Sequence, residues 1–135
     1  MYKTTIQRIM EKLEKLLMDY NLQHIDDLIV SPWSKQYCRT PFPLYWQKVY
    51  DIMEKIDRKL KVFEIGCGQG DVTTIFCYLG FHSVCSFEKV PQLAENAKRR
   101  IENLFDRKDI IIQEEYPNPK YGLCDVLAVS YTHLR

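Results

Sequence analysis

The sequence lacks the features that mark membrane, secreted and metal-binding proteins. It contains no apolar run long enough to span a bilayer, and its N-terminus has no apolar leader segment. Its five cysteines include no Cys-x-x-Cys pair. An odd number of cysteines without metal-ligand spacing argues against both a disulfide framework and a zinc site. We therefore expect a cytoplasmic protein with free thiols and no bound metal.

An excess of charge of either sign is also missing. The chain has 19 Lys and Arg residues against 18 Asp and Glu residues, for a formal net charge of +1, and no basic block. Nothing in this balance indicates nucleic acid as a partner. What the sequence does contain is apolar material for a core, since 46% of its residues are hydrophobic. A chain of 135 residues with this composition is expected to form one globular domain.

The most informative stretch is an apolar run that ends in an acid and three alternating glycines. Val62–Ile65 predicts a buried strand that includes Glu64, and Gly66, Gly68 and Gly70 follow before a helical pattern. A strand that enters a helix through a glycine-rich turn lets a ligand approach main-chain N–H groups without obstruction by side chains. We therefore predict a cofactor-binding turn, with a ligand-free glycine turn as the alternative.

A second acid follows the next predicted strand. Ser83–Phe87 is a buried-type run, and Glu88 comes directly after it. In doubly wound sheets the carboxyl ends of the strands face the ligand, and an acid about 20 residues past the glycines can accept hydrogen bonds from ribose hydroxyls. Glu88 is therefore a candidate ribose ligand. The alternative is a solvated carboxylate at the end of a strand.

The order of strand, Glu-x-Gly-x-Gly-x-Gly and helix resembles the first motif of class I S-adenosylmethionine-dependent methyltransferases. The resemblance implies that Glu64 and the three glycines hold the methionine and ribose parts of S-adenosylmethionine, and that Glu88 holds the ribose hydroxyls. In that family an acid after the third strand commonly meets the adenine amino group. Glu114 is the nearer candidate here, and a solvated pair with Glu115 is the alternative. The stretch Phe87–Ala97 is also similar to protein isoaspartyl methyltransferases, although it is too short to indicate an acceptor.

Two other functional classes stay open. Dinucleotide enzymes carry Gly-x-Gly-x-x-Gly, but the position of the third glycine is Asp71 here. We expect this carboxylate to repel a pyrophosphate and to suit a cationic cofactor, which makes an NAD-dependent oxidoreductase the second hypothesis. A non-catalytic nucleotide-binding module is the third. The sequence leaves the methyl acceptor, the catalytic residues and the oligomeric state undetermined.

The remaining periodicities complete the expected fold. Amphipathic helices are predicted at Thr5–Tyr20, Tyr45–Arg58, Val72–Leu79 and Pro91–Phe105, the last with Lys98, Arg99 and Arg100 on its solvated side. Further buried strands are predicted at Asp109–Gln113 and Cys124–Ala128. The expected class is α/β: a partial doubly wound, Rossmann-like parallel sheet of about four strands with an N-terminal helical extension.

These elements suggest three parts of the chain. Residues 1–44 are expected to form a helical extension and a loop, in which Trp33 and Tyr37 either close over the cofactor or anchor the loop to the core. Residues 45–128 are expected to be the N-terminal half of a methyltransferase domain. Residues 129–135 equal the translation of GTC TCT TAT ACA CAT CTC CGA, which reads as a transposase sequencing adapter. We expect an adapter-derived tail after Ala128, which resequencing of the parent DNA would test, and no catalytic role for His133.

Overall fold

The computed structural model describes residues 5–24 and 44–129. The predicted lid residues Trp33 and Tyr37 lie outside these ranges, as does the predicted tail 129–135 except for its first residue, Val129. The elements are, in chain order, α1 (Thr5–Gln23), α4 (Leu44–Met53), β1 (Lys61–Ile65), α5 (Asp71–Leu79), β2 (Ser83–Phe87), α6 (Pro91–Phe105), β3 (Ile111–Ile112), the 3-10 helix η1 (Pro119–Tyr121) and β4 (Val126–Val129).

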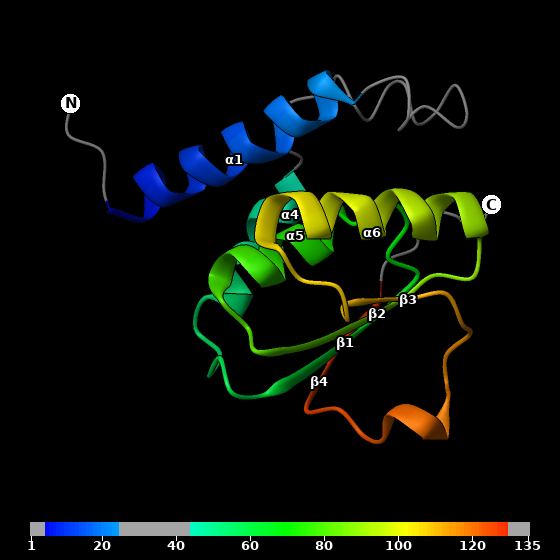
Figure 1. The fold of residues 1–135 in the computed structure, drawn as a ribbon. Helices are drawn as coiled ribbons and strands as arrows, with labels where there is room; N and C mark the ends of the chain where they lie inside the picture. Colours follow the sequence, from blue (N-terminus) through cyan, green and yellow to red (C-terminus); the bar gives the residue numbers. More distant parts are fainter. Residues whose placement is uncertain (1–4, 25–43, 130–135) are drawn as a thin grey trace.

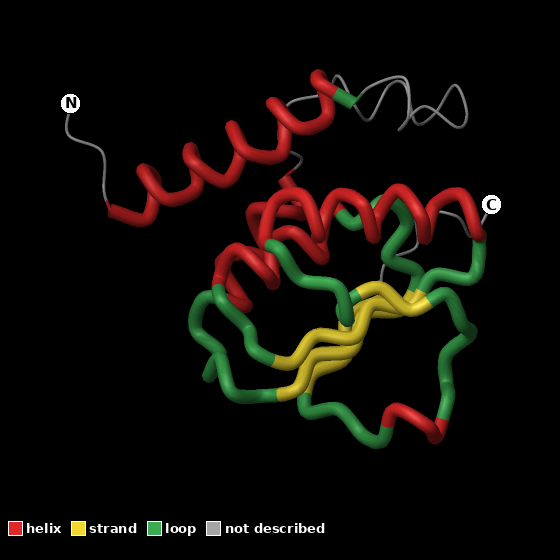
Figure 2. The backbone as a smooth tube through the Cα atoms, in the orientation of Figure 1, coloured by secondary structure: helices red, strands yellow, loops and turns green. Residues whose placement is uncertain are grey.

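The described strands form one parallel sheet in the order β3-β2-β1-β4. Strand β1 pairs with both β2 and β4, so it occupies the interior of the sheet. Helices α4, α5 and α6 lie together over one face of the sheet, and α1 lies beyond them (Figure 1, Figure 2). This arrangement confirms the predicted α/β class and the Rossmann-like parallel sheet.

The core lies between this helical layer and the sheet. Because side chains alternate along a strand, Val62 of β1 and Val84 of β2 point to the helix-covered face, where both are buried. Helix α5 contacts α1, α4 and α6, which makes it the centre of the layer. Leu13 and Leu17 of α1 are fully buried and belong to the same apolar cluster. The apolar stripe of the predicted N-terminal helix therefore packs on its own domain.

The opposite face of the sheet carries an aromatic cluster. Phe63 of β1 and Phe87 of β2 lie 5.4 Å apart between ring centroids. Tyr116 contacts both rings, and Tyr121 contacts that of Phe87. Both tyrosines belong to the segment between β3 and β4, which crosses beneath the sheet in Figure 1. Towards β4 this face is more open, and Leu127 is 48% exposed.

Several predicted boundaries were wrong. Helix α1 ends at Gln23 rather than at Tyr20, and β4 is Val126–Val129 rather than Cys124–Ala128. Helix α4 ends at Met53 rather than at Arg58. The Arg58 guanidinium instead donates hydrogen bonds to the carbonyl oxygens at the end of this helix, including that of Glu54 at 2.8 Å, and to Leu79 O at 2.8 Å. Strand β3 has only two residues rather than five, and its last residue, Ile112, lies opposite Phe87, where its partner β2 ends.

Candidate functional site

A glycine-rich turn joins β1 to α5 at the carboxyl edge of the sheet. Gly66, Gly68 and Gly70 have φ angles of 71°, 56° and 86°, a left-handed conformation that side chains disfavour. The N–H groups of Gly66 and Cys67 donate to Phe87 O at 2.8 and 3.1 Å, and the N–H of Gly70 donates to Cys67 O at 3.0 Å. The turn is thus tied to the end of β2, with these three donors satisfied inside the protein.

Glu88 lies directly against this turn. Its Oε1 accepts a hydrogen bond from the Gly68 N–H at 2.8 Å, and its Oε2 accepts one from the Val90 N–H at 3.0 Å. The side chain is 1% exposed. The structure therefore brings together the acid after the second strand and the glycines after the first, as expected where two parallel strands end side by side.

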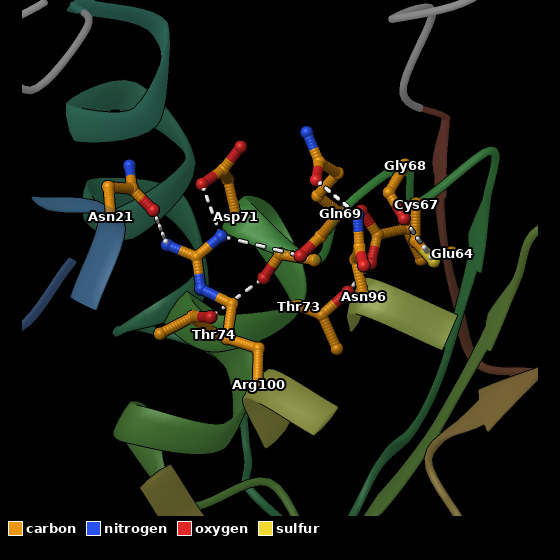
Figure 3. Close-up of polar contacts among 11 residues, drawn as sticks. Asn21, Glu64, Cys67, Gly68, Gln69, Asp71, Thr73, Thr74, Asn96 and Arg100 are labelled. Atoms are coloured by element: carbon orange, nitrogen blue, oxygen red, sulfur yellow. Dashed lines mark hydrogen bonds and ion pairs between the residues drawn. The ribbon is translucent and has the colours of Figure 1, made fainter. Parts of the chain in front are cut away.

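Glu64 lies beneath the turn and is fully buried. Its Oε1 accepts hydrogen bonds from Thr73 Oγ1 at 2.6 Å and from Ser86 Oγ at 2.9 Å. Thr73 comes from α5 and Ser86 from β2, so the Glu64 carboxylate joins the three elements that surround the turn. Figure 3 shows Glu64 and Thr73 beside the turn. These bonds fix the orientation of Glu64 from two sides.

Cys67 reports the electrostatic character of the turn. Its thiol is buried, and burial raises its pKa well above the usual value, with further increases from the nearby carboxylates of Glu64 and Glu88. Two acids that disfavour a thiolate create a negative potential at the same place. The surroundings of the turn therefore suit a cation and oppose an anion.

The cysteines should differ in reactivity for this reason. At pH 8 we expect iodoacetamide to modify Cys67 and Cys77 at least about 10-fold more slowly than Cys124, because only the thiolate reacts. Burial raises the pKa of Cys77 to about 11, and its reaction rate should keep rising as the pH increases towards that value. Mass spectrometry of the native protein after timed alkylation measures the three rates. Equal rates at Cys67 and Cys124 would contradict the buried, negative environment.

Arg100 contradicts the prediction that it lies on the solvated side of its helix. The side chain is 1% exposed, and it forms an ion pair with Asp71 at 2.6 Å. The sequence did not distinguish Arg100 from the exposed Lys98 and Arg99, because the three basic residues are consecutive. Its position did carry a signal, since Arg100 lies three positions after the buried Ala97, at the edge of the apolar stripe. Because Arg100 balances the charge of Asp71, that carboxylate is a weaker argument against a pyrophosphate than the sequence suggested.

Gly70 has a packing role in the structure. A Cβ atom added at this position would lie 3.3 Å from Cβ of Ala97, so the start of α5 approaches α6 closely. The neighbouring Gln69 is held by the same helix, since Asn96 Nδ2 donates to Gln69 Oε1 at 2.9 Å. The third glycine of the motif thus sets the contact between helix and turn.

Glu114 follows the edge strand β3, which β2 separates from β1. Its Oε2 accepts a hydrogen bond from the Tyr121 hydroxyl, and this bond is the main reason that the pKa of Tyr121 is raised. The structure therefore places Glu114 with the loop that covers the aromatic face of the sheet.

Within residues 5–24 and 44–129, no three His, Cys, Asp or Glu side chains are grouped as metal ligands. Likewise, no helix in the described part of the chain is both long and apolar enough to cross a membrane.

Comparison with known proteins identifies relatives of this fold and motif. Residues 34–116 match the family model described as protein-L-isoaspartate(D-aspartate) O-methyltransferase. No curated protein sequence matches the chain significantly. A solved structure titled protein-L-isoaspartate O-methyltransferase is similar with a TM-score of 0.53 and 21% identity, covering 88% of this chain and 47% of the solved one. The chain thus spans about half the length of that protein. Since the family model covers more than half of its residues, the chain belongs to the protein-L-isoaspartate(D-aspartate) O-methyltransferase family.

Proposed function

We propose that the chain binds S-adenosylmethionine at the turn between β1 and α5 and supplies the cofactor-binding part of a methyltransferase. Residues 45–128 would form this part, and residues 1–44 a helical extension packed upon it. The observation that carries the proposal is the meeting of the Glu88 carboxylate with the Gly68 N–H at 2.8 Å. This contact places an acid and the glycine turn on one site.

The donors and charges of the turn favour this cofactor over a dinucleotide. A pyrophosphate needs main-chain N–H groups that point at it. Here the N–H groups of Gly66, Cys67, Gly68 and Gly70 donate to acceptors within the protein. S-adenosylmethionine carries a cationic sulfonium and an ammonium, so it gains from the negative charge of Glu64 and Glu88, which adds to the effect of burial on the pKa of Cys67. The four engaged donors and the nearby carboxylates, rather than Asp71, therefore disfavour the NAD-dependent alternative.

Different residues of the site would contact different parts of S-adenosylmethionine. Glu88 would accept hydrogen bonds from the ribose hydroxyls, which a carboxylate can combine with those from backbone donors because each oxygen has two acceptor positions. The glycines would allow close approach to the methionine portion, and Glu64 would hold the turn by its bonds to Thr73 and Ser86. Glu114 is the proposed adenine contact, which requires exchange of its bond to Tyr121.

For the acceptor we propose, following the family description, the free carboxylate of an isoaspartyl or D-aspartyl residue. In an isoaspartyl residue this is the α-carboxylate, because the peptide bond runs through the side-chain carboxyl group, whereas in a D-aspartyl residue it is the side-chain carboxylate. Such a carboxylate is already ionised at neutral pH, so the reaction needs no general base. S-adenosylmethionine, when bound, supplies a methyl group on a good leaving group. The work left to the protein is orientation of the two reactants and exclusion of water.

Binding and transfer should be tested separately. Calorimetry with S-adenosylmethionine and with NAD should show binding of the former only. Methyl transfer is then measured on an isoaspartyl peptide and on the matched aspartyl peptide, with methylation of the isoaspartyl peptide expected. Preference for NAD would overturn the cofactor assignment. Binding of S-adenosylmethionine without transfer to either peptide would favour the non-catalytic binding module.

A further inference from the structure

Arg100 connects three parts of the molecule at the base of the cofactor turn. From α6 it donates to Asp71 Oδ1 at 2.6 Å and to Gln69 O at 3.3 Å, the residues on either side of Gly70. Its Nη2 donates to Asn21 Oδ1 of α1 at 2.9 Å. Figure 3 shows the guanidinium between Asn21 on one side and the turn on the other.

Because the Arg100 guanidinium is buried, its hydrogen bonds are important for stability. A buried charge is costly unless it is paired and hydrogen-bonded, and loss of one partner is strongly destabilising. Among the described residues, the Nε of Arg100 has no hydrogen-bond partner. The polar compensation of the guanidinium therefore comes from its terminal nitrogens, which bind Asp71, Gln69 and Asn21.

The contact with α1 lies at the end of that helix. Asn21 is 3% exposed, and the neighbouring Tyr20 presents its ring to Arg100, with Cζ 5.1 Å from the ring centroid. A cation over an aromatic ring gains energy, more so when it is desolvated. Docking of α1 thus supplies two of the contacts that hold Arg100, and Arg100 in turn holds the segment Gln69–Asp71.

We propose that Arg100 is a positioning residue for the cofactor turn, and that it makes the rigidity of this turn depend on the docking of α1. The inference rests on the proposed binding of S-adenosylmethionine for its effect on affinity. Its structural part, a turn held from α1 through Arg100, stands without that function. The test therefore has one readout for each.

The first readout is amide hydrogen exchange of the full chain without cofactor. Arg100→Met and the milder Asn21→Ala should both speed exchange of residues 66–71 by a larger factor than exchange of β1, because local opening affects the turn alone. Lys98→Met, which removes a neighbouring exposed cation from α6, should change neither segment. An equal increase in the turn and in β1 would show a loss of overall stability only and would overturn the proposal.

The second readout is the affinity for S-adenosylmethionine. We expect a decrease of about 10-fold for Arg100→Met and about threefold for Asn21→Ala, with no added effect of Asn21→Ala in the Arg100→Met background. Arg100→Lys should be intermediate, since an ammonium cannot reach all three acceptors at once. Additive effects of the two substitutions would overturn the coupling through Arg100. If the unmodified chain binds no S-adenosylmethionine, the proposed function fails while hydrogen exchange still decides the role of Arg100.

Discussion

Replacement of Glu88 by glutamine is expected to weaken binding of S-adenosylmethionine about 100-fold. The change removes the negative charge and with it the charge-assisted hydrogen bonds to ribose, each worth about 1.5–3 kcal/mol. It also turns one acceptor into a donor. Both Glu88 oxygens accept hydrogen bonds from main-chain N–H groups. The NH₂ group of the glutamine would therefore face the N–H donor of Gly68 or of Val90. Isothermal titration calorimetry measures the affinity.

The matched control is Glu95→Gln, which removes an exposed carboxylate from α6. This variant should bind the cofactor as the unmodified chain does. Because Glu88→Gln leaves a buried donor facing another donor, it should also lower the free energy of unfolding by about 1–3 kcal/mol. Unchanged affinity in a folded Glu88→Gln protein would refute the assignment of Glu88 to the cofactor.

Replacement of Gly70 by alanine should destabilise the protein by about 3 kcal/mol, roughly twice the effect of Gly80→Ala. The two glycines flank α5 and share one conformation, with φ of 86° and 87° and ψ of 25° at both. Backbone strain is therefore equal. A Cβ at Gly70 would meet Cβ of Ala97 at 3.3 Å, whereas one at Gly80 would have no contact within 4 Å. Urea denaturation of the three proteins gives the difference.

Ala97 offers a way to separate contact from strain. In the Gly70→Ala background, Ala97→Gly removes the crowding atom, so the extra loss relative to Gly80→Ala should shrink. Ala97→Gly by itself costs about 1 kcal/mol of helix propensity, which must be subtracted. Equal losses for Gly70→Ala and Gly80→Ala would mean that the close approach of α6 contributes nothing.

Much of the fold could be predicted because it depends on periodicity along the chain. The alternation in Val62–Ile65 and Ser83–Phe87 and the apolar stripe of Pro91–Phe105 are local signals, and the structure has these elements within one residue. The end of α4 was not predictable. It depends on Arg58, whose bond to Leu79 O joins residues that are distant in sequence. The C-terminal end of β3 likewise coincides with the end of its partner β2.

The candidate site also combines features that the sequence predicts with features that depend on distant contacts. That Glu88 would meet the glycine turn could be predicted from topology, since each follows a parallel strand. The engagement of the turn's N–H groups could not be predicted, because their acceptors are Phe87 O, Cys67 O and the Glu88 carboxylate. Arg100 was hidden because a cation in a basic run is usually solvated. Its burial depends on acceptors that are distant in sequence, namely Asn21 of α1, Gln69 and Asp71.

The packing of α1 has a practical consequence for anyone who trims this protein. A version that begins at residue 44 would resemble a complete minimal domain, because it keeps every described strand and the glycine turn. It would nevertheless strip Asn21 from the guanidinium and uncover the surface on which Leu13 and Leu17 lie. Weak cofactor binding by such a shortened protein would reflect the missing helix rather than a defective pocket.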